Sequence, residues 1–168
     1  MPLWWYSYTT VVVRILKILL AALVFAGAVF YVVSFNREKA LVLEIRNTVS
    51  GRVSGKWPLD VTGEFSIEFV HSVHQSPVRE TFRFENGMIR PVSVRFASFG
   101  AGMQSDLEEG QTLIRDGDAM IITQFGTSFR ELNYIVGTVS DHLLFVNGEI
   151  ISLRELCGRN AHITIRVK

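Results

Sequence analysis

The chain has 168 residues, of which 48% are hydrophobic and 20% charged, and its 17 basic residues nearly balance its 16 acidic ones. This length allows one domain of ordinary size. A net charge of +1 argues against a nucleic-acid-binding protein, which needs a basic surface to neutralise phosphates. The high hydrophobic content also excludes a disordered chain.

The charges divide the chain into two parts. Residues 1–35 contain Arg14 and Lys17 and no acidic residue, whereas residues 40–168 contain 13 basic and 15 acidic residues, a net charge of −2. We therefore expect a membrane anchor with a short tether over residues 1–39, followed by one domain over residues 40–168.

The first part contains a long apolar run. Ile18–Phe35 is 18 residues without a charge, and a helix of this length is long enough to span a bilayer. A cleaved signal peptide is the alternative, with Arg14 and Lys17 as its basic region. The bulky residues 33–35 do not form a signal-peptidase site, so we expect an uncleaved, single-pass anchor, although sequence alone leaves cleavage open.

The side of the membrane on which the body lies is not fixed by charge. Two basic residues precede the span and four follow it by residue 52, which favours a cytoplasmic body. A folded domain of about 130 residues, however, can cross a membrane largely regardless of its charge. Cys157 has no second cysteine to pair with, so it does not indicate the redox compartment.

After residue 40, polar and apolar residues alternate with a period of two, which predicts β-strands separated by glycine- and asparagine-containing turns. Residues 106–110 allow one helical turn at most. We predict an all-β domain, an antiparallel β-sandwich or small barrel, after one N-terminal transmembrane helix. The expected strands are Glu64–Phe69, Val78–Phe84, Val92–Phe96, Ala119–Phe125, Leu132–Val136, His142–Val146, Glu149–Leu153 and Ala161–Val167.

The first two strands are expected to form a hairpin across the four residues His74–Pro77. Val73 then lies opposite Val78, and the same register sets His71 opposite Glu80 on the apolar face. An unpaired charge on such a face is costly, so the two groups need each other. The pair either fixes the register or lines a binding cleft, and the sequence leaves both interpretations open.

The next turn is predicted to have three residues, 85–87, with a bulge at its glycine. A two-residue turn would place Arg83 against Arg90, and like charges directly opposite each other are destabilising. The three-residue turn instead sets Phe84 opposite Met88.

Other residues suggest chemistry less strongly. His71 and His74 would point to opposite faces of a strand, so they do not predict a metal site. Ser72 with His142 and Asp141 would supply the residue types of a hydrolase triad, but no G-x-S-x-G sequence is present, and Asp141 is better interpreted as capping a turn. We expect no metal and no cofactor, and we assign no catalytic residue.

A glycine-rich loop follows the expected strand Val92–Phe96. The sequence Phe99-Gly100-Ala101-Gly102-Met103 could direct backbone N–H groups toward an anion. It lacks the lysine and the following helix of a nucleotide-binding loop, so a nucleotide site is not expected.

Together these motifs resemble the bacterial family called domain of unknown function 1850. The resemblance covers about residues 41–153, and Gln104 departs from it because the family's loop usually carries proline there. It is carried by four short motifs: His71-Ser72-Val73, Pro77-Val78-x-Glu80, Ser98-Phe99-Gly100-Ala101-Gly102-Met103 and Asp141-His142.

The resemblance implies a companion of TRAP transporters of the TAXI type, which take up carboxylates. It implies a bacterial inner-membrane protein with a periplasmic body, whose partner is a transporter membrane subunit or a solute-binding protein. The other expected partners are the bilayer, through Ile18–Phe35, and a small anionic ligand, through the glycine-rich loop. The candidate binding residues are His71, Ser72, Glu80, Phe99, Gly100, Ala101, Gly102, Asp141 and His142.

Two functions remain open at this point. The first is a non-enzymatic accessory protein of such a transporter. The alternative is a membrane-anchored hydrolase or small-ligand-binding enzyme that uses a cleft formed by His71, Ser72, Glu80 and His142. The sequence identifies neither the ligand nor the oligomeric state nor the partner surface.

Overall fold

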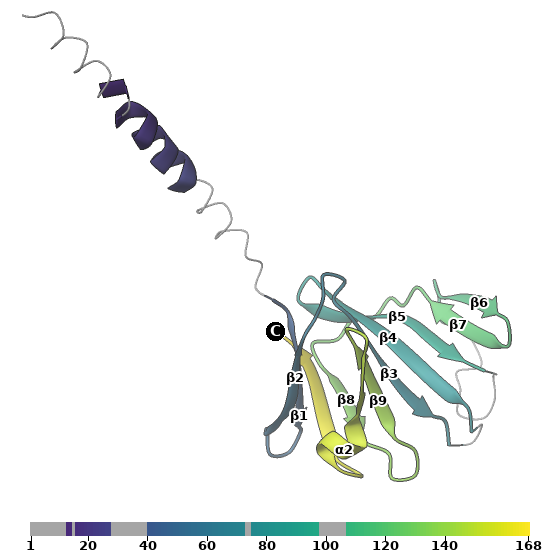
Figure 1. The fold of residues 1–168 in the computed structure, drawn as a ribbon. Coiled ribbons are helices and arrows are strands. Elements are labelled where there is room, and N and C mark those ends of the chain that lie inside the picture. The colour runs from purple at the N-terminus through teal and green to yellow at the C-terminus, as the bar shows by residue number, and fades with distance from the viewer. Residues whose placement is uncertain (1–12, 15, 28–39, 73–74, 98–106) are drawn as a thin grey trace, which may run out of the picture. The chain divides into compact units, whose positions relative to one another are not determined.

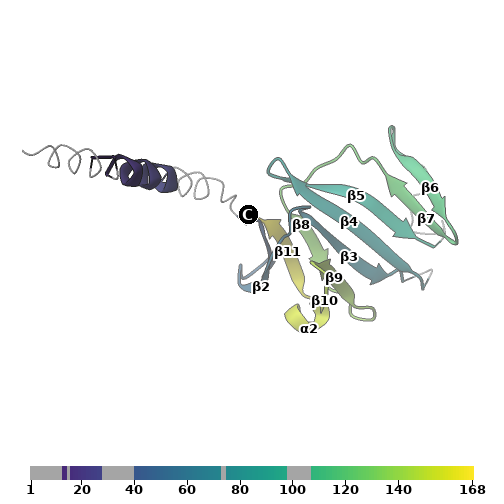
Figure 2. The same cartoon turned by 45° about the horizontal axis from the view of Figure 1, so that its top comes forward.

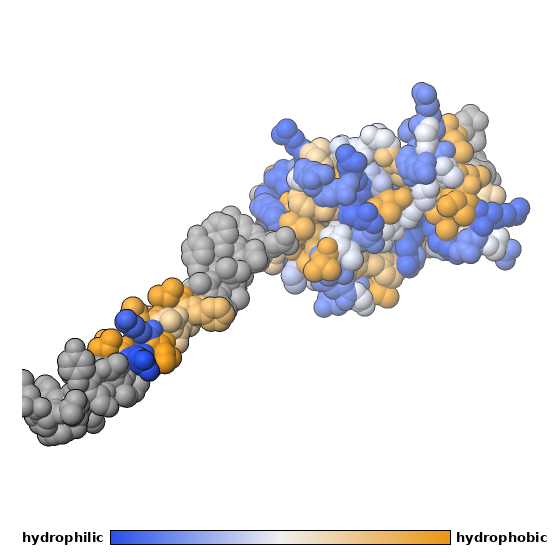
Figure 3. Space-filling model, turned by 90° about the horizontal axis from the view of Figure 1, so that it is seen from above, coloured by the Kyte–Doolittle hydropathy of each residue, from blue (hydrophilic) through white to orange (hydrophobic). Residues whose placement is uncertain are grey.

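A computed structural model describes residues 13–14, 16–27, 40–72, 75–97 and 107–168 (Figure 1). The chain divides into two units, Met1–Lys39 and Ala40–Lys168. The described residues of the first unit are helical, and the face visible in Figure 3 is largely apolar along them. None of the helices in the described ranges combines the length and the apolar character needed to cross a membrane. The transmembrane span therefore stays a prediction, and residues 28–35 of it lie outside the described ranges.

The second unit consists of strands in two antiparallel sheets, which confirms the all-β prediction (Figures 1 and 2). The smaller sheet has the order β2-β1-β11-β8 and the larger one β10-β9-β3-β4-β5-β7-β6, with one short helix, α2, after β10. The bounds are β1 Val42–Asn47, β2 Val53–Pro58, β3 Glu64–Val70, β4 Pro77–Glu85, β5 Met88–Phe96, β6 Thr112–Asp116, β7 Ala119–Thr123, β8 Leu132–Ile135, β9 His142–Val146, β10 Glu149–Ser152, α2 Leu153–Cys157 and β11 His162–Val167.

All eight strands predicted from the alternation are present, with ends that differ by a few residues. Three strands and the helix were not predicted: β1, β2, β6 and α2. Two of these three strands, β1 and β2, belong to the smaller sheet, so the sequence pattern indicated the larger sheet far better.

The two sheets share one hydrophobic core. Ile45 of β1 and Ile163 of β11 face Ile67 of β3 and Leu144 of β9 in a single cluster, and each is fully buried. A second cluster is formed by the buried residues Val78, Phe96 and Ile122 of the larger sheet. Phe125, in the loop after β7, packs against it, and no residue of the smaller sheet belongs to it. The larger sheet therefore continues past the edge of the smaller one, as Figure 2 shows.

The register predicted for the first hairpin is wrong by four residues. Phe69 lies opposite Val78 and Ile67 opposite Glu80, so the predicted pair of His71 and Glu80 does not form. The loop closes two residues earlier than expected, because the His71 N–H donates to the Ser76 carbonyl at 2.9 Å and the four residues between them are 72–75 instead of 74–77. Side chains alternate between the two faces of a strand, so a register shift by an even number of residues keeps each face. Glu80 therefore still lies on the face that the alternation predicted.

The predicted three-residue turn between β4 and β5 is also wrong. Glu85 pairs with Met88 across the two residues Asn86 and Gly87, whose φ angles of 52° and 77° suit a tight hairpin turn. Arg83 and Arg90 do lie opposite each other. Each has its own carboxylate: Glu64 lies 2.5 Å from Arg83 and Glu85 lies 3.4 Å from Arg90, so these carboxylates offset the repulsion.

A bulge does occur in this hairpin, but in the middle of the strands. Thr81 pairs with Ser93 whereas Phe82 pairs with Pro91, which leaves Val92 as the extra residue. Proline has no N–H for the ladder, and bulges are one of the places where a strand accepts it. The two-residue turn and the bulge each shift the predicted register by one residue, and together they bring Val94 opposite Glu80.

Candidate functional site

One row of opposed residues runs across six strands of the larger sheet. Its members are Leu144, Ile67, Glu80, Val94, Ile122 and Leu113. Ile67, Leu144 and Ile122 are buried, so the row belongs to the inner face of the sheet. Glu80 is the one ionisable residue in a row that is otherwise apolar, and a carboxyl group in such a place needs a polar partner.

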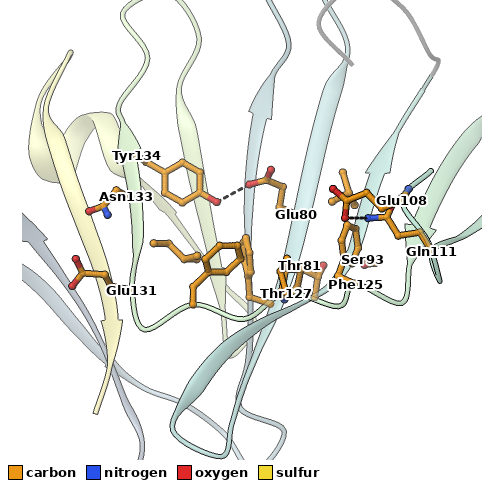
Figure 4. Close-up of a pocket in the computed structure, with 15 residues that line it drawn as sticks. Glu80, Thr81, Ser93, Glu108, Gln111, Phe125, Thr127, Glu131, Asn133 and Tyr134 are labelled. Carbon is orange, nitrogen blue, oxygen red and sulfur yellow. Dashed lines mark hydrogen bonds between the residues drawn. The ribbon is translucent and has the colours of Figure 1, made fainter. Parts of the chain in front are cut away.

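That partner comes from the smaller sheet. The Tyr134 hydroxyl of β8 donates a hydrogen bond of 2.6 Å to Glu80 Oε2 (Figure 4). Burial raises the pKa of Glu80, and the hydrogen bond from Tyr134 opposes this rise. Burial and the neighbouring carboxyl group raise the pKa of Tyr134, so its hydroxyl stays protonated and available as the donor at neutral pH. The Glu80–Tyr134 hydrogen bond therefore links the two sheets.

A pocket of about 600 Å³ lies beside this hydrogen bond, which we call the inter-sheet pocket. One side consists of residues 131–134 of β8 and its approach, and the other of β4 and β5 (Figure 4). Three carboxylates line it, those of Glu80, Glu108 and Glu131, and the described lining residues include no lysine, arginine or histidine. The ionisable groups among these lining residues are therefore acidic.

A second pocket of about 480 Å³ contains three of the sequence-predicted residues. His71, Ser72 and His142 line it together with residues 137–140. Glu80 lines the inter-sheet pocket instead, so the predicted cleft is divided between two sites. The ring of His142 stacks on Phe69 at 5.2 Å and lies 6.1 Å, edge-on, from the ring of Tyr134, so it packs between the two pockets.

The contacts of His142 and Asp141 do not form a hydrolase triad. His142 Nδ1 accepts a hydrogen bond of 3.1 Å from the Gly137 N–H, and burial lowers the pKa of this imidazole, so the neutral form is favoured. In a triad, Nδ1–H would donate to the carboxylate. Asp141 instead accepts hydrogen bonds from Ser152 Oγ at 2.5 Å and from the Arg154 N–H at 3.0 Å. Its carboxylate therefore binds the first turn of α2, whose N-cap residue is Ser152.

Four of the predicted site residues belong to the glycine-rich loop after β5. Phe99, Gly100, Ala101 and Gly102 lie outside the described residues, so anion binding by their loop stays a prediction. Within the described ranges, no group of three or more histidine, cysteine or acidic side chains is placed to hold a metal ion.

Tyr134 is the residue of this site that the sequence reasoning missed. The alternation of β8 set it on the same face as Leu132, so its inward direction was predictable. Its contact with Glu80 joins positions 54 residues apart in the chain. The contact depends on how the two sheets pack, which the alternation within one strand does not show.

The comparison with family models gives one match. The model described as Domain of unknown function (DUF1850) matches residues 65–153, more than half of the chain. The chain belongs to this family. The DUF1850 match includes Glu80, Tyr134 and His142, whereas β1, β2 and β11 lie outside it. No curated protein and no solved structure matches the chain.

Proposed function

We propose that this DUF1850 protein is a membrane-anchored, non-enzymatic binding protein that serves as an accessory to a TRAP-type uptake transporter of the TAXI type. One observation carries the proposal. Residues 16–27 are helical, and the exposed fractions of Leu16, Leu20, Leu23 and Phe25 lie between 67% and 74%. Lys17 is the one charged residue of residues 16–27, so the rest of this helical surface is apolar and needs an apolar environment, which a bilayer supplies.

The body supports a binding role. It has a core of its own in residues 40–168, with two pockets beside that core. We place this body outside the cytoplasm, with a transporter membrane subunit or a solute-binding protein as its partner, because these are the associations that the family resemblance implies.

The anchor can be tested with alkaline phosphatase fused after Lys168. The wild-type fusion is expected to be active and to remain in the membrane after alkaline extraction. Leu20→Arg with Leu23→Arg should abolish both properties, because each arginine costs about 2.5–3.5 kcal/mol near the centre of a membrane helix. Val49→Arg with Val61→Arg is the matched control, since both valines are at least 88% exposed on the body. An inactive wild-type fusion would contradict the proposed topology.

The transporter association can be tested by purifying the tagged full-length protein from detergent-solubilised native membranes. A membrane subunit or solute-binding protein of a TAXI-type transporter is expected to co-purify in near-stoichiometric amount, and mass spectrometry identifies it. An unrelated single-pass protein with the same tag and expression level is the control. Equal recovery of the transporter with both proteins, or its absence, would exclude the accessory function.

A further inference from the structure

We propose that the inter-sheet pocket binds a small organic cation, an amine with an aromatic or branched aliphatic group, and that Glu80 receives its ammonium group. The inference goes beyond the proposed function, because it does not require a transporter partner. It is carried by the charge, the shape and the apolar wall of the pocket.

The charge of the pocket favours a cation. Glu131 is paired with Arg166 at 2.5 Å, so its charge is compensated. Glu108 accepts a hydrogen bond of 3.1 Å from the uncharged amide of Gln111. Within the described part of the chain, the Tyr134 hydroxyl is the hydrogen-bond partner of the Glu80 side chain. Two carboxylates thus face the pocket without a cationic partner in the described structure, and complementary charge favours a positive ligand.

The same charge argues against an anionic ligand in this pocket. A carboxylate in this pocket would be repelled by Glu80 and Glu108, with no lysine, arginine or histidine among the described lining residues to offset the repulsion. A cation would be attracted instead. A positive charge beside Glu80 also favours the ionised form of this carboxyl group, which burial disfavours.

The wall of the pocket favours an organic molecule over a metal ion. Phe82, Phe125, Phe129 and Leu132 provide apolar and aromatic surface, and a volume of about 600 Å³ is in the range of small-molecule sites. Aromatic rings also attract ammonium groups. In the view of Figure 4, Glu108 and Glu131 lie on either side of Glu80, and the described acidic side chains do not converge as metal ligands.

The experiment uses three probes with one carbon skeleton: 3-phenylpropylamine, 3-phenylpropanol and 3-phenylpropanoate. Each is titrated into the full-length protein in an uncharged detergent near neutral pH, with calorimetry as the readout. The amine is expected to bind about tenfold more tightly than the alcohol, because a hydrogen-bonded charge pair contributes that much or more. The carboxylate is expected not to bind.

Glu80→Gln should remove the preference for the amine over the alcohol. Glu64→Gln is the matched control, because Glu64 lies in the neighbouring strand and pairs with Arg83 outside the pocket. If the Glu80 variant does not fold, Glu108→Gln, an exposed position, should lower amine affinity about threefold. The proposal is overturned if the carboxylate binds as well as the amine, if no probe binds at millimolar concentration, or if no pocket variant changes amine affinity.

Discussion

Glu80→Ala is expected to lower the free energy of unfolding by about 2–4 kcal/mol, because it leaves the Tyr134 hydroxyl in the inter-sheet region without its acceptor and also creates a cavity. Tyr134→Phe should cost about 1–3 kcal/mol, since it removes the donor to a carboxyl group on the inner face. The double variant should cost less than the sum of the two, with a coupling of about 1 kcal/mol or more. Urea unfolding of the wild type, the two single variants and the double variant, followed by circular dichroism, gives the free energies for this double-mutant cycle.

The matched control is the pair Glu64 and Arg83, which lies in the same hairpin but has side chains that are 36% and 45% exposed. Removing either of these residues is expected to change the free energy of unfolding by about 0–1 kcal/mol, the usual range for an exposed ion pair. If the effects of Glu80→Ala and Tyr134→Phe added within about 0.5 kcal/mol, the inter-sheet hydrogen bond would not contribute to stability.

Glu80 should also make stability depend on pH in a defined direction. Burial raises its pKa in the folded state above the ordinary 4.5 of the unfolded chain, so the folded state binds the proton more tightly. The resulting stabilisation is complete below the unfolded pKa and is lost as the pH rises through the folded pKa. Glu80→Gln has no such proton. Its stability relative to the wild type should therefore increase as the pH rises above the ordinary pKa of 4.5.

The alternation of residues predicted faces correctly but could not predict register. Both strands of the β3–β4 hairpin keep their inner faces when one slides past the other by two or four residues. The register depends on where the connecting loop closes, and here the backbone of His71 bonds to Ser76 and Gln75, with Gln75 at a φ of 50°. The sequence therefore set Glu80 on the inner face and gave it the wrong partner.

The strands that the sequence reasoning missed carry residues that are unusual in strands. In β2, Gly55 lies under the ring of Trp57, where a Cβ atom would come within 2.2 Å of that ring, so a larger residue would displace the ring. In β1, Glu44 is 3% exposed, and its hydrogen bonds to Arg46 and other cations lower its pKa to about 2. Two of its ion-pair partners, Lys56 and Lys168, come from β2 and the end of the chain, and an alternation pattern does not reveal such pairs.

The last prediction concerns Gly137, between β8 and β9. A Cβ atom added there would lie 2.1 Å from the backbone oxygen of Ser140 and 3.4 Å from His142 Nδ1. Gly137→Ala is expected to cost about 3 kcal/mol, at the upper end for overpacking, because a backbone oxygen cannot rotate away as a side chain can. The displacement should also break the hydrogen bond from the Gly137 N–H to His142, whose imidazole lines the pocket with His71 and Ser72.

Gly126→Ala is the matched control for this change. A Cβ atom at residue 126 has nothing within 4 Å, and the backbone there does not require a positive φ. Its effect should stay within about 0.5 kcal/mol, as for most surface substitutions. Urea unfolding measures both variants, and the histidine ring signals in NMR spectra report the environment of His142. Because the glycine and the histidine are joined through one hydrogen bond, a destabilised Gly137→Ala protein with an unchanged His142 signal would mean that the segment 137–140 does not position the imidazole.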